Sequence, residues 1–272
     1  MMKHTDEIYG YLGDIQTVKV KPLITKSITI KPSDIISGVI DKISKNDSYD
    51  VFYFNGKSML STNTRILLDA KNISKMDVES LLYSIPHIGP NDTIQEAAKI
   101  IFDYRTREAP VVENNKILGS FTAKKILELL SKKGNKSIKA KMIYTKDPIT
   151  ISSEKSLSNA KKIMTTKRLD HLPIINKGKI KQVLTPAHII EYIIPQERQG
   201  KRSVGIRTAH KLEFEIGDIG STRIPQCIPD DDLAKILNSM LKTDTTCCLV
   251  KTDETLEGII TFRDILGLIS KS

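Results

Sequence analysis

Apolar residues recur at helical spacing in four separate stretches of this 272-residue chain. The stretches begin after turn residues, at Pro32, Pro90, Ser153 and Pro229, and each presents the single apolar face typical of a partly buried helix. The apolar positions are Ile36, Val39, Ile40 and Ile43; Ile94, Ala97, Ala98 and Ile101; Leu157, Ala160 and Met164; and Leu233, Ile236, Leu237 and Met240. Because both the spacing and the phase repeat, the sequence predicts four copies of one supersecondary unit, numbered here one to four in chain order.

Strand-like segments complete each unit. After the predicted helices, short apolar runs flank turns such as Asn-Asn, Lys-Gly or Asp-Glu, which indicates antiparallel hairpins. A threonine then precedes a second apolar helix, at Thr62, Thr122, Thr185 and Thr261. Each unit therefore reads β-α-β-β-α, and the expected fold class is α/β (α+β), with small mixed sheets backed by helices.

Turn residues and charge suggest how the units group. A helix end, a lysine-rich stretch and Gly134 follow unit two, so we expect one half at 1–135 and a second at 136–272. An extra stretch at 194–217 separates units three and four. We interpret it either as an ordered loop or short helix that faces a partner or ligand, or as a disordered segment.

Bulk composition indicates a soluble globular protein. Hydrophobic residues make up 39% and charged residues 27% of the chain, and no apolar run approaches the length needed to span a bilayer. The first residues lack the apolar core of a signal peptide, so we expect a cytoplasmic protein. Three cysteines without metal-ligand spacing favour buried thiols over disulfides or a zinc site.

The net charge of +10 is concentrated in two segments. Residues 131–146 contain six lysines and no acid, and residues 198–211 contain five Lys or Arg and no acid. Such segments could neutralise nucleic-acid phosphates, so DNA or RNA binding is an alternative function. Against it, the chain has no tryptophan, 5% aromatic residues and no recognisable nucleic-acid-binding motif.

The end of unit four resembles the CBS domain in the run Gly258-Ile259-Ile260-Thr261-Phe262-Arg263-Asp264-Ile265-Leu266. Segments 142–151 and 218–222 are similar to the opening of that family's repeat. The resemblance implies that units one and two, and units three and four, pair into two Bateman modules. It also implies a stand-alone regulatory sensor that binds AMP, ADP, ATP, a diadenosine polyphosphate or another adenosyl ligand, needs no cofactor and forms a homodimer.

Asp264 is the candidate with the clearest chemistry. One ionised carboxylate can accept hydrogen bonds from both hydroxyls of a ribose. Thr261 would cap the following helix, whose free N–H groups and positive dipole end suit a phosphate, and Arg263 lies between them in the motif. The alternative is that Thr-x-x-Asp is only a helix cap and needs no ligand.

The resemblance also implies further ligand residues. Adenine would lie against the opening strand of unit four, at Thr222, Arg223 and Ile224, and the phosphates would meet Arg168 and His171 of unit three.

The remaining units depart from the motif. Arg65 and Lys125 occupy the acid's position in units one and two and cannot accept a hydrogen bond from a hydroxyl. In unit three, Thr185 and His188 could form a second, weaker site. The sequence contains no HExxH, GxSxG, phosphate-binding loop or GxGxxG motif, so we expect a protein that is not an enzyme.

Overall fold

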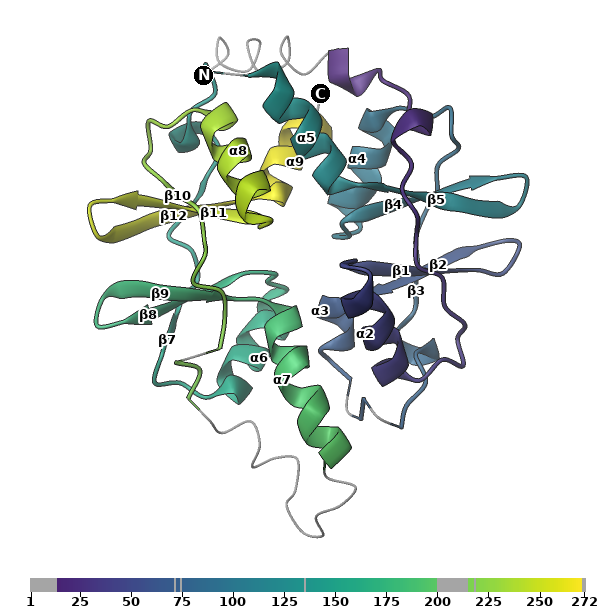
Figure 1. Ribbon diagram of the computed structural model, residues 1–272, viewed down its shortest axis with the longest axis horizontal. Coiled ribbons are helices and arrows are strands. Elements are labelled where there is room, and N and C mark those ends of the chain that lie inside the picture. Colours follow the sequence, from purple (N-terminus) through teal and green to yellow (C-terminus); the bar gives the residue numbers. More distant parts are fainter. Residues whose placement is uncertain are drawn as a thin grey trace.

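A computed structural model describes residues 14–270, except 71, 74, 135, 200–214 and 218, and omits the side chains of 194–199. Its four units each carry a small sheet and helices (Figure 1). Unit one contains η1 (Lys21–Leu23), α2 (Ile36–Lys45), β1 (Asp50–Phe54), β2 (Met59–Asn63) and α3 (Thr64–Leu67). Unit two contains η2 (Glu79–Leu81), β3 (Tyr83–Ser84), α4 (Ile94–Asp103), β4 (Glu108–Glu113), β5 (Lys116–Thr122) and α5 (Ala123–Lys133).

Units three and four continue the same order of elements. Unit three contains η3 (Ala140–Met142), β6 (Thr145–Lys146), β7 (Ile151–Ser152), α6 (Leu157–Lys167), β8 (Leu172–Asn176), β9 (Lys179–Leu184) and α7 (Pro186–Gln199). Unit four contains β10 (Gln226–Cys227), α8 (Leu233–Thr243), β11 (Cys247–Thr252), β12 (Thr255–Thr261) and α9 (Phe262–Ser270). The predicted α/β class with small mixed sheets is confirmed.

The first helix of every unit buries the face that the sequence predicts. All fifteen apolar positions named for α2, α4, α6 and α8 are buried. Side chains of Thr93, Ser156 and Asp232 cap the starts of α4, α6 and α8 by accepting a backbone N–H three residues later. The hairpins are also confirmed, since β4–β5, β8–β9 and β11–β12 are antiparallel.

A charged residue in the left-handed conformation lies at or just after the end of each first helix. The four residues are Asp47 (φ 48°), Arg105 (φ 53°), Arg168 (φ 54°) and Asp244 (φ 52°). This conformation is common where helices end. The corresponding turn therefore carries a carboxylate in units one and four and a guanidinium in units two and three.

The opening segment of each unit joins the sheet of the neighbouring unit. β6 of unit three pairs with β12 of unit four, and β3 of unit two pairs with β2 of unit one. Isolated bridges complete the exchange by linking Thr25 to Ser120 and Val183 to Ser221. Units one and two, and units three and four, are thus interlocked through their sheets.

Apolar residues hold the four units together in two ways. Sheet faces pack unit one on unit two around Phe52, Met59, Ile85 and Val112, and unit three on unit four around Val183, Cys247, Leu249 and Ile259. Two larger clusters form between helices, one joining units two and four and the other joining units one and three. Figure 1 shows the first of these as the group α4, α5, α8 and α9. The helices therefore pack across the proposed boundary at 135/136, while the sheet-face clusters stay within each half.

The second helix of unit one, α3, begins one residue later than the sequence predicts. It begins at Thr64, and its N-cap is Asn63, whose side-chain oxygen accepts the Ile66 N–H at 3.2 Å. The equivalent motif positions are therefore Asn63 and Ile66, one residue beyond the predicted Thr62 and Arg65. An asparagine oxygen caps a helix as well as a threonine hydroxyl, so a threonine search misplaces the register.

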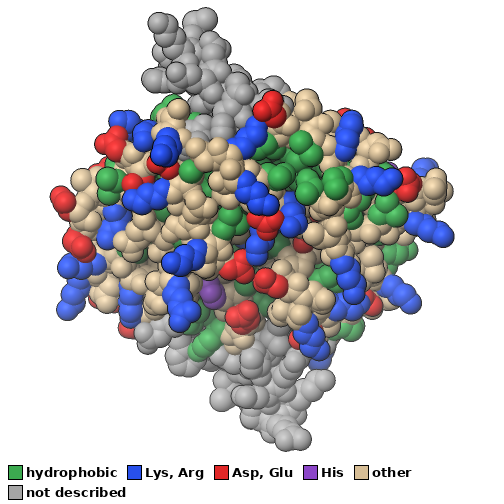
Figure 2. All heavy atoms as spheres, turned by 45° about the horizontal axis from the view of Figure 1, so that its top comes forward, with side chains coloured by type: hydrophobic (Ala, Val, Ile, Leu, Met, Phe, Trp, Pro, Cys, Tyr) green, Lys and Arg blue, Asp and Glu red, His purple; other side chains and the backbone are tan. Residues whose placement is uncertain are grey.

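The two basic segments lie partly within the described residues. Most of the basic segment 198–211 lies outside the described residues, and α7 extends into the stretch 194–217 as far as Gln199. In segment 131–146, Lys133 pairs with Asp14 (3.1 Å) and Lys141 with Asp230 (2.6 Å). Figure 2 shows Lys and Arg scattered among acidic side chains on the face in view.

The three cysteines are buried free thiols, as predicted: Cys227, Cys247 and Cys248. Within the described ranges, no helix combines the length and apolar character needed to cross a membrane.

Candidate functional site

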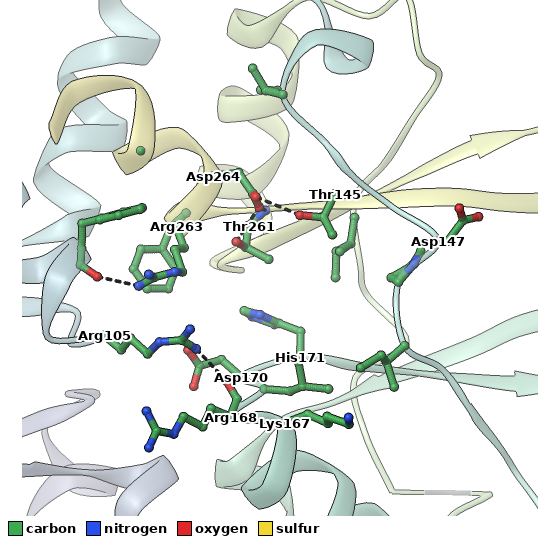
Figure 3. Close-up of a pocket in the computed structure, with 18 of the residues that line it drawn as sticks. Arg105, Thr145, Asp147, Lys167, Arg168, Asp170, His171, Thr261, Arg263 and Asp264 are labelled. Atoms are coloured by element: carbon green, nitrogen blue, oxygen red, sulfur yellow. Dashed lines mark hydrogen bonds between the residues drawn. The ribbon is translucent and has the colours of Figure 1, made fainter. Parts of the chain in front are cut away.

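A cavity of about 700 Å³ lies where units two, three and four meet (Figure 3). Four segments line it: the end of α4, the opening of unit three at 142–149, the turn after α6 at 167–171, and the start of α9. The cavity brings together five of the predicted site residues, which are Thr261, Arg263, Asp264, Arg168 and His171.

Asp264 both caps α9 and faces the cavity. Its Oδ2 accepts the Thr261 backbone N–H and the Thr261 hydroxyl, each at 2.7 Å. Its Oδ1 accepts the Thr145 hydroxyl at 3.0 Å. The capping role that the sequence left as an alternative is therefore present. A carboxylate has about four acceptor positions, so capping does not use all of them.

Arg263 connects α9 to unit two. Its Nη1 donates to the Phe102 carbonyl at 2.6 Å, and the guanidinium lies 4.3 Å from the centre of the Phe102 ring. Partial burial, together with the nearby charge of Arg105, lowers the pKa of Arg263. The side chain thus contributes positive charge near the cavity while its position is fixed by α4.

Basic side chains gather on the side of the cavity opposite α9. Figure 3 shows Arg168 and Lys167 across from Thr261 and Asp264. Arg105 extends from unit two, and its Nη1 donates a hydrogen bond to the Arg168 carbonyl of unit three at 3.4 Å. Among the described lining residues, four cationic side chains meet three carboxylates: Arg105, Lys167, Arg168 and Arg263 against Asp147, Asp170 and Asp264. Asp170 already interacts with Arg65 (3.4 Å) and with the Tyr49 hydroxyl (2.6 Å). The other charged side chains give the lining an excess of positive charge, which favours an anion.

His171 enters this site as a neutral side chain. It is 8% exposed, and its Nε2 lies 2.8 Å from the Thr246 hydroxyl. Burial, with the positive charge of Arg107, lowers the pKa of His171 to about 4. At neutral pH the imidazole can exchange hydrogen bonds but carries no charge to attract a phosphate.

The structure does not bring the other predicted residues to this cavity. Among the described residues that line it, segment 142–149 of unit three occupies the place expected for Thr222, Arg223 and Ile224. The reason is the strand exchange, because the opening of unit four crosses to unit three, where Ser221 bridges Val183. Thr185 and His188 are at the start of α7 instead, where His188 Nδ1 accepts the Thr185 N–H at 3.1 Å.

The lining residues that the sequence did not predict include Phe102, Arg105, Thr145 and Lys167. Arg105 and Phe102 come from unit two, and Thr145 comes from the exchanged strand of unit three. Thr145 belongs to segment 142–151, which the resemblance identified, but its place in the sheet of unit four was not predicted. No local motif marks Arg105 and Phe102, because their place depends on how α4 packs against α9.

Comparison with known families identifies the class of protein. The CBS domain model matches residues 78–132, 140–195 and 216–271, which together exceed half of the chain. The chain belongs to the CBS-domain family, and its paired units form two Bateman modules. The first unit is not among the matched residues, although it has the same order of elements.

Individual relatives are distant. An uncharacterised 33.4 kDa protein in the ribosomal RNA operon of Thermofilum pendens is 21% identical over 197 residues, covering 72% of this chain and 65% of that protein. The uncharacterised protein MJ1232 of Methanocaldococcus jannaschii is 28% identical over 152 residues, covering 48% of this chain and 50% of the relative. The matched regions thus span about half to two thirds of these relatives.

A solved structure supports the fold. The crystal structure of protein MJ1225 from Methanocaldococcus jannaschii, described as a putative archaeal homologue of g-AMPK, has a TM-score of 0.80. The identity is 16%, and the match covers 92% of this chain and 99% of that chain. At this identity the likeness concerns the arrangement of the four units.

Proposed function

We propose that this protein is a non-catalytic sensor that binds an adenosine phosphate in the 700 Å³ cavity. The observation that carries the proposal is the placement of Asp264 and the start of α9 opposite Lys167 and Arg168. A ribose diol would bond to the carboxylate, and a phosphate would lie between the free N–H groups of α9 and the cationic side chains.

The cavity also offers an apolar surface for a base. Ile143, Pro148 and Ile149 line it from unit three, and Ile149 is exposed. An adenine ring could lie against these side chains while its polar edge meets the exchanged strand. Thr145 would exchange its hydrogen bond with Asp264 for one to the ligand, so binding need not leave either group without a partner.

Replacing Asp264 with asparagine should weaken adenylate binding about tenfold or more. The amide keeps the size of the side chain but turns one acceptor into a donor, and a hydrogen bond to a charged group is worth about 1.5 to 3 kcal/mol. Isothermal titration calorimetry with AMP, ADP and ATP measures the change. Thermal shift with S-adenosylmethionine and a diadenosine polyphosphate would identify the preferred ligand.

Asp232→Asn is the matched control, because Asp232 caps α8 by accepting the Lys235 N–H at 2.8 Å and does not line the cavity. It should bind adenylates as the wild type does. Equal affinities for Asp264→Asn and the wild type, or equal binding of GTP and ATP, would contradict the proposal. Binding that depends steeply on salt and ignores Asp264 would instead favour nucleic-acid phosphates. The homodimer stays a prediction. A single chain already brings four units together.

A further inference from the structure

A second cavity, of about 330 Å³, is lined by residues of all four units. Part of its lining is equivalent to part of the first cavity when unit one replaces unit three and unit two replaces unit four, but the opening of unit one, residues 25–28, lines a separate cavity of about 250 Å³. The turn after the first helix contributes Asp47 and Asp244 here, where the first cavity has Arg168 and Arg105. The start of α5 takes the place of the start of α9.

The second cavity has the opposite balance of charge from the first. Among the described residues, the second cavity has four carboxylates and two cationic side chains: Asp47, Glu108, Glu191 and Asp244 against Arg107 and Lys124. Lys124 is paired with Asp244 at 2.6 Å. Asp47, Glu191 and Asp244 are exposed, so a phosphate would meet negative charge at the entrance.

The cationic Arg107 is held by the protein itself. Its guanidinium lies 3.9 Å from the centre of the Tyr49 ring and 5.4 Å from that of Phe262. Two aromatic faces can stabilise a cation without an anion. The rings stabilise the charge of Arg107, but its Nε has no hydrogen-bond partner among the described residues.

Apolar walls and one unpartnered hydroxyl complete the cavity. Ile40, Leu127, Ile190 and Met240 line it between the polar groups. Thr64 also lines it, with 4% of its surface exposed, and its Oγ1 has no hydrogen-bond partner among the described residues. A buried hydroxyl without a partner is unfavourable, which points to a polar group of a ligand at this position.

We propose that the second cavity binds a linear aliphatic polyamine. One ammonium group would lie at the acidic entrance near Asp47 and Glu191, the methylene chain would follow the apolar walls, and an inner amino group would donate to Thr64 Oγ1. An aliphatic chain with separated cationic groups matches this order of acidic, apolar and polar surface. The site is separate from the adenylate cavity, and Phe262 lines both.

Thermal shift and calorimetry with spermidine test this inference, with NaCl and MgCl2 at matched ionic strength as references. Spermidine should raise the melting temperature beyond either salt. Thr64→Val should leave the free protein at least as stable, because it removes an unpartnered hydroxyl, yet weaken spermidine binding about threefold. The double variant Asp47→Asn with Glu191→Gln should weaken it about tenfold. Asp147→Asn, in the first cavity, should bind spermidine normally.

Several results would overturn the polyamine site. They are the absence of any effect beyond that of NaCl, an equal effect of MgCl2, unchanged affinity in the double variant or in Thr64→Val, and competition between AMP and spermidine. Loss of the adenylate response alone, with the spermidine response intact, would instead contradict the proposed function and leave this inference supported.

Discussion

Replacing Asp50 with asparagine should raise the free energy of unfolding at pH 8 by up to about 4 kcal/mol and change it little at pH 4. Asp50 is fully buried, and its Oδ2 accepts the Arg107 backbone N–H at 2.7 Å. Burial, with the nearby Glu108 carboxyl, raises the pKa of Asp50 to about 7. The fold therefore favours the neutral acid, which an asparagine resembles in shape and charge.

The direction of this pH dependence follows from the number of protons that the folded and unfolded chains bind. Between about pH 4 and pH 7 the unfolded chain ionises Asp50 while the folded chain keeps it protonated, so stability present below pH 4 is lost as pH rises through 7. His171 acts in the opposite direction, because its folded pKa of about 4 lies below its ordinary 6.5, and stability is lost as pH falls through that interval. The two dependences partly cancel in the wild type.

Urea denaturation at pH 4, 6 and 8 measures the effect. In Asp50→Asn the dependence due to His171 should remain, so stability should rise from pH 4 to about 6.5. Asp147→Asn changes an exposed carboxyl and should reproduce the wild-type profile. If Asp50→Asn and the wild type were equally stable at pH 8, the ionised Asp50 would not be costly, and the proton would have to reside elsewhere in the cluster.

The sequence was most informative where structure is local. The buried faces of α2, α4, α6 and α8 follow from spacing alone, because residues three and four apart on a helix share a face. Hairpins follow in the same way from turn chemistry between short strands. The capping geometry of Thr261 and Asp264 was also correctly anticipated as one of two interpretations.

The sequence was least informative where units meet. The placement of adenine against Thr222 assumed that each opening strand stays with its own unit, but β6 and Ser221 join the neighbouring sheets. Arg105 reaches the first cavity only because α4 packs on α9 across the molecule. Neither relation leaves a periodic signal, since both depend on contacts between residues far apart in the chain.

Replacing Gly258 with alanine should lower the free energy of unfolding by about 3 kcal/mol, the second largest effect expected here. The substitution tests the strand exchange between units three and four. Gly258 lies on β12 opposite Lys146 of β6. A Cβ at this position would overlap a Tyr144 ring carbon and lie 2.7 Å from the Thr145 carbonyl oxygen, which belongs to backbone. To relieve the overlap, β6 would have to move away from β12, which would also open the wall of the first cavity.

The matched control is Gly38→Ala, because Gly38 lies in α2 and a Cβ there meets no atom within 4 Å. That change should raise stability by about 0.5 to 1 kcal/mol through helix propensity. Urea denaturation of both variants gives the comparison, and Gly119→Ala provides a second case, because its Cβ would overlap the Thr25 carbonyl oxygen in the sheet of unit two. If Gly258→Ala and Gly119→Ala were as stable as the wild type, the opening strands could not cross so closely, and the wall that segment 142–149 forms in the adenylate cavity would have to be placed differently.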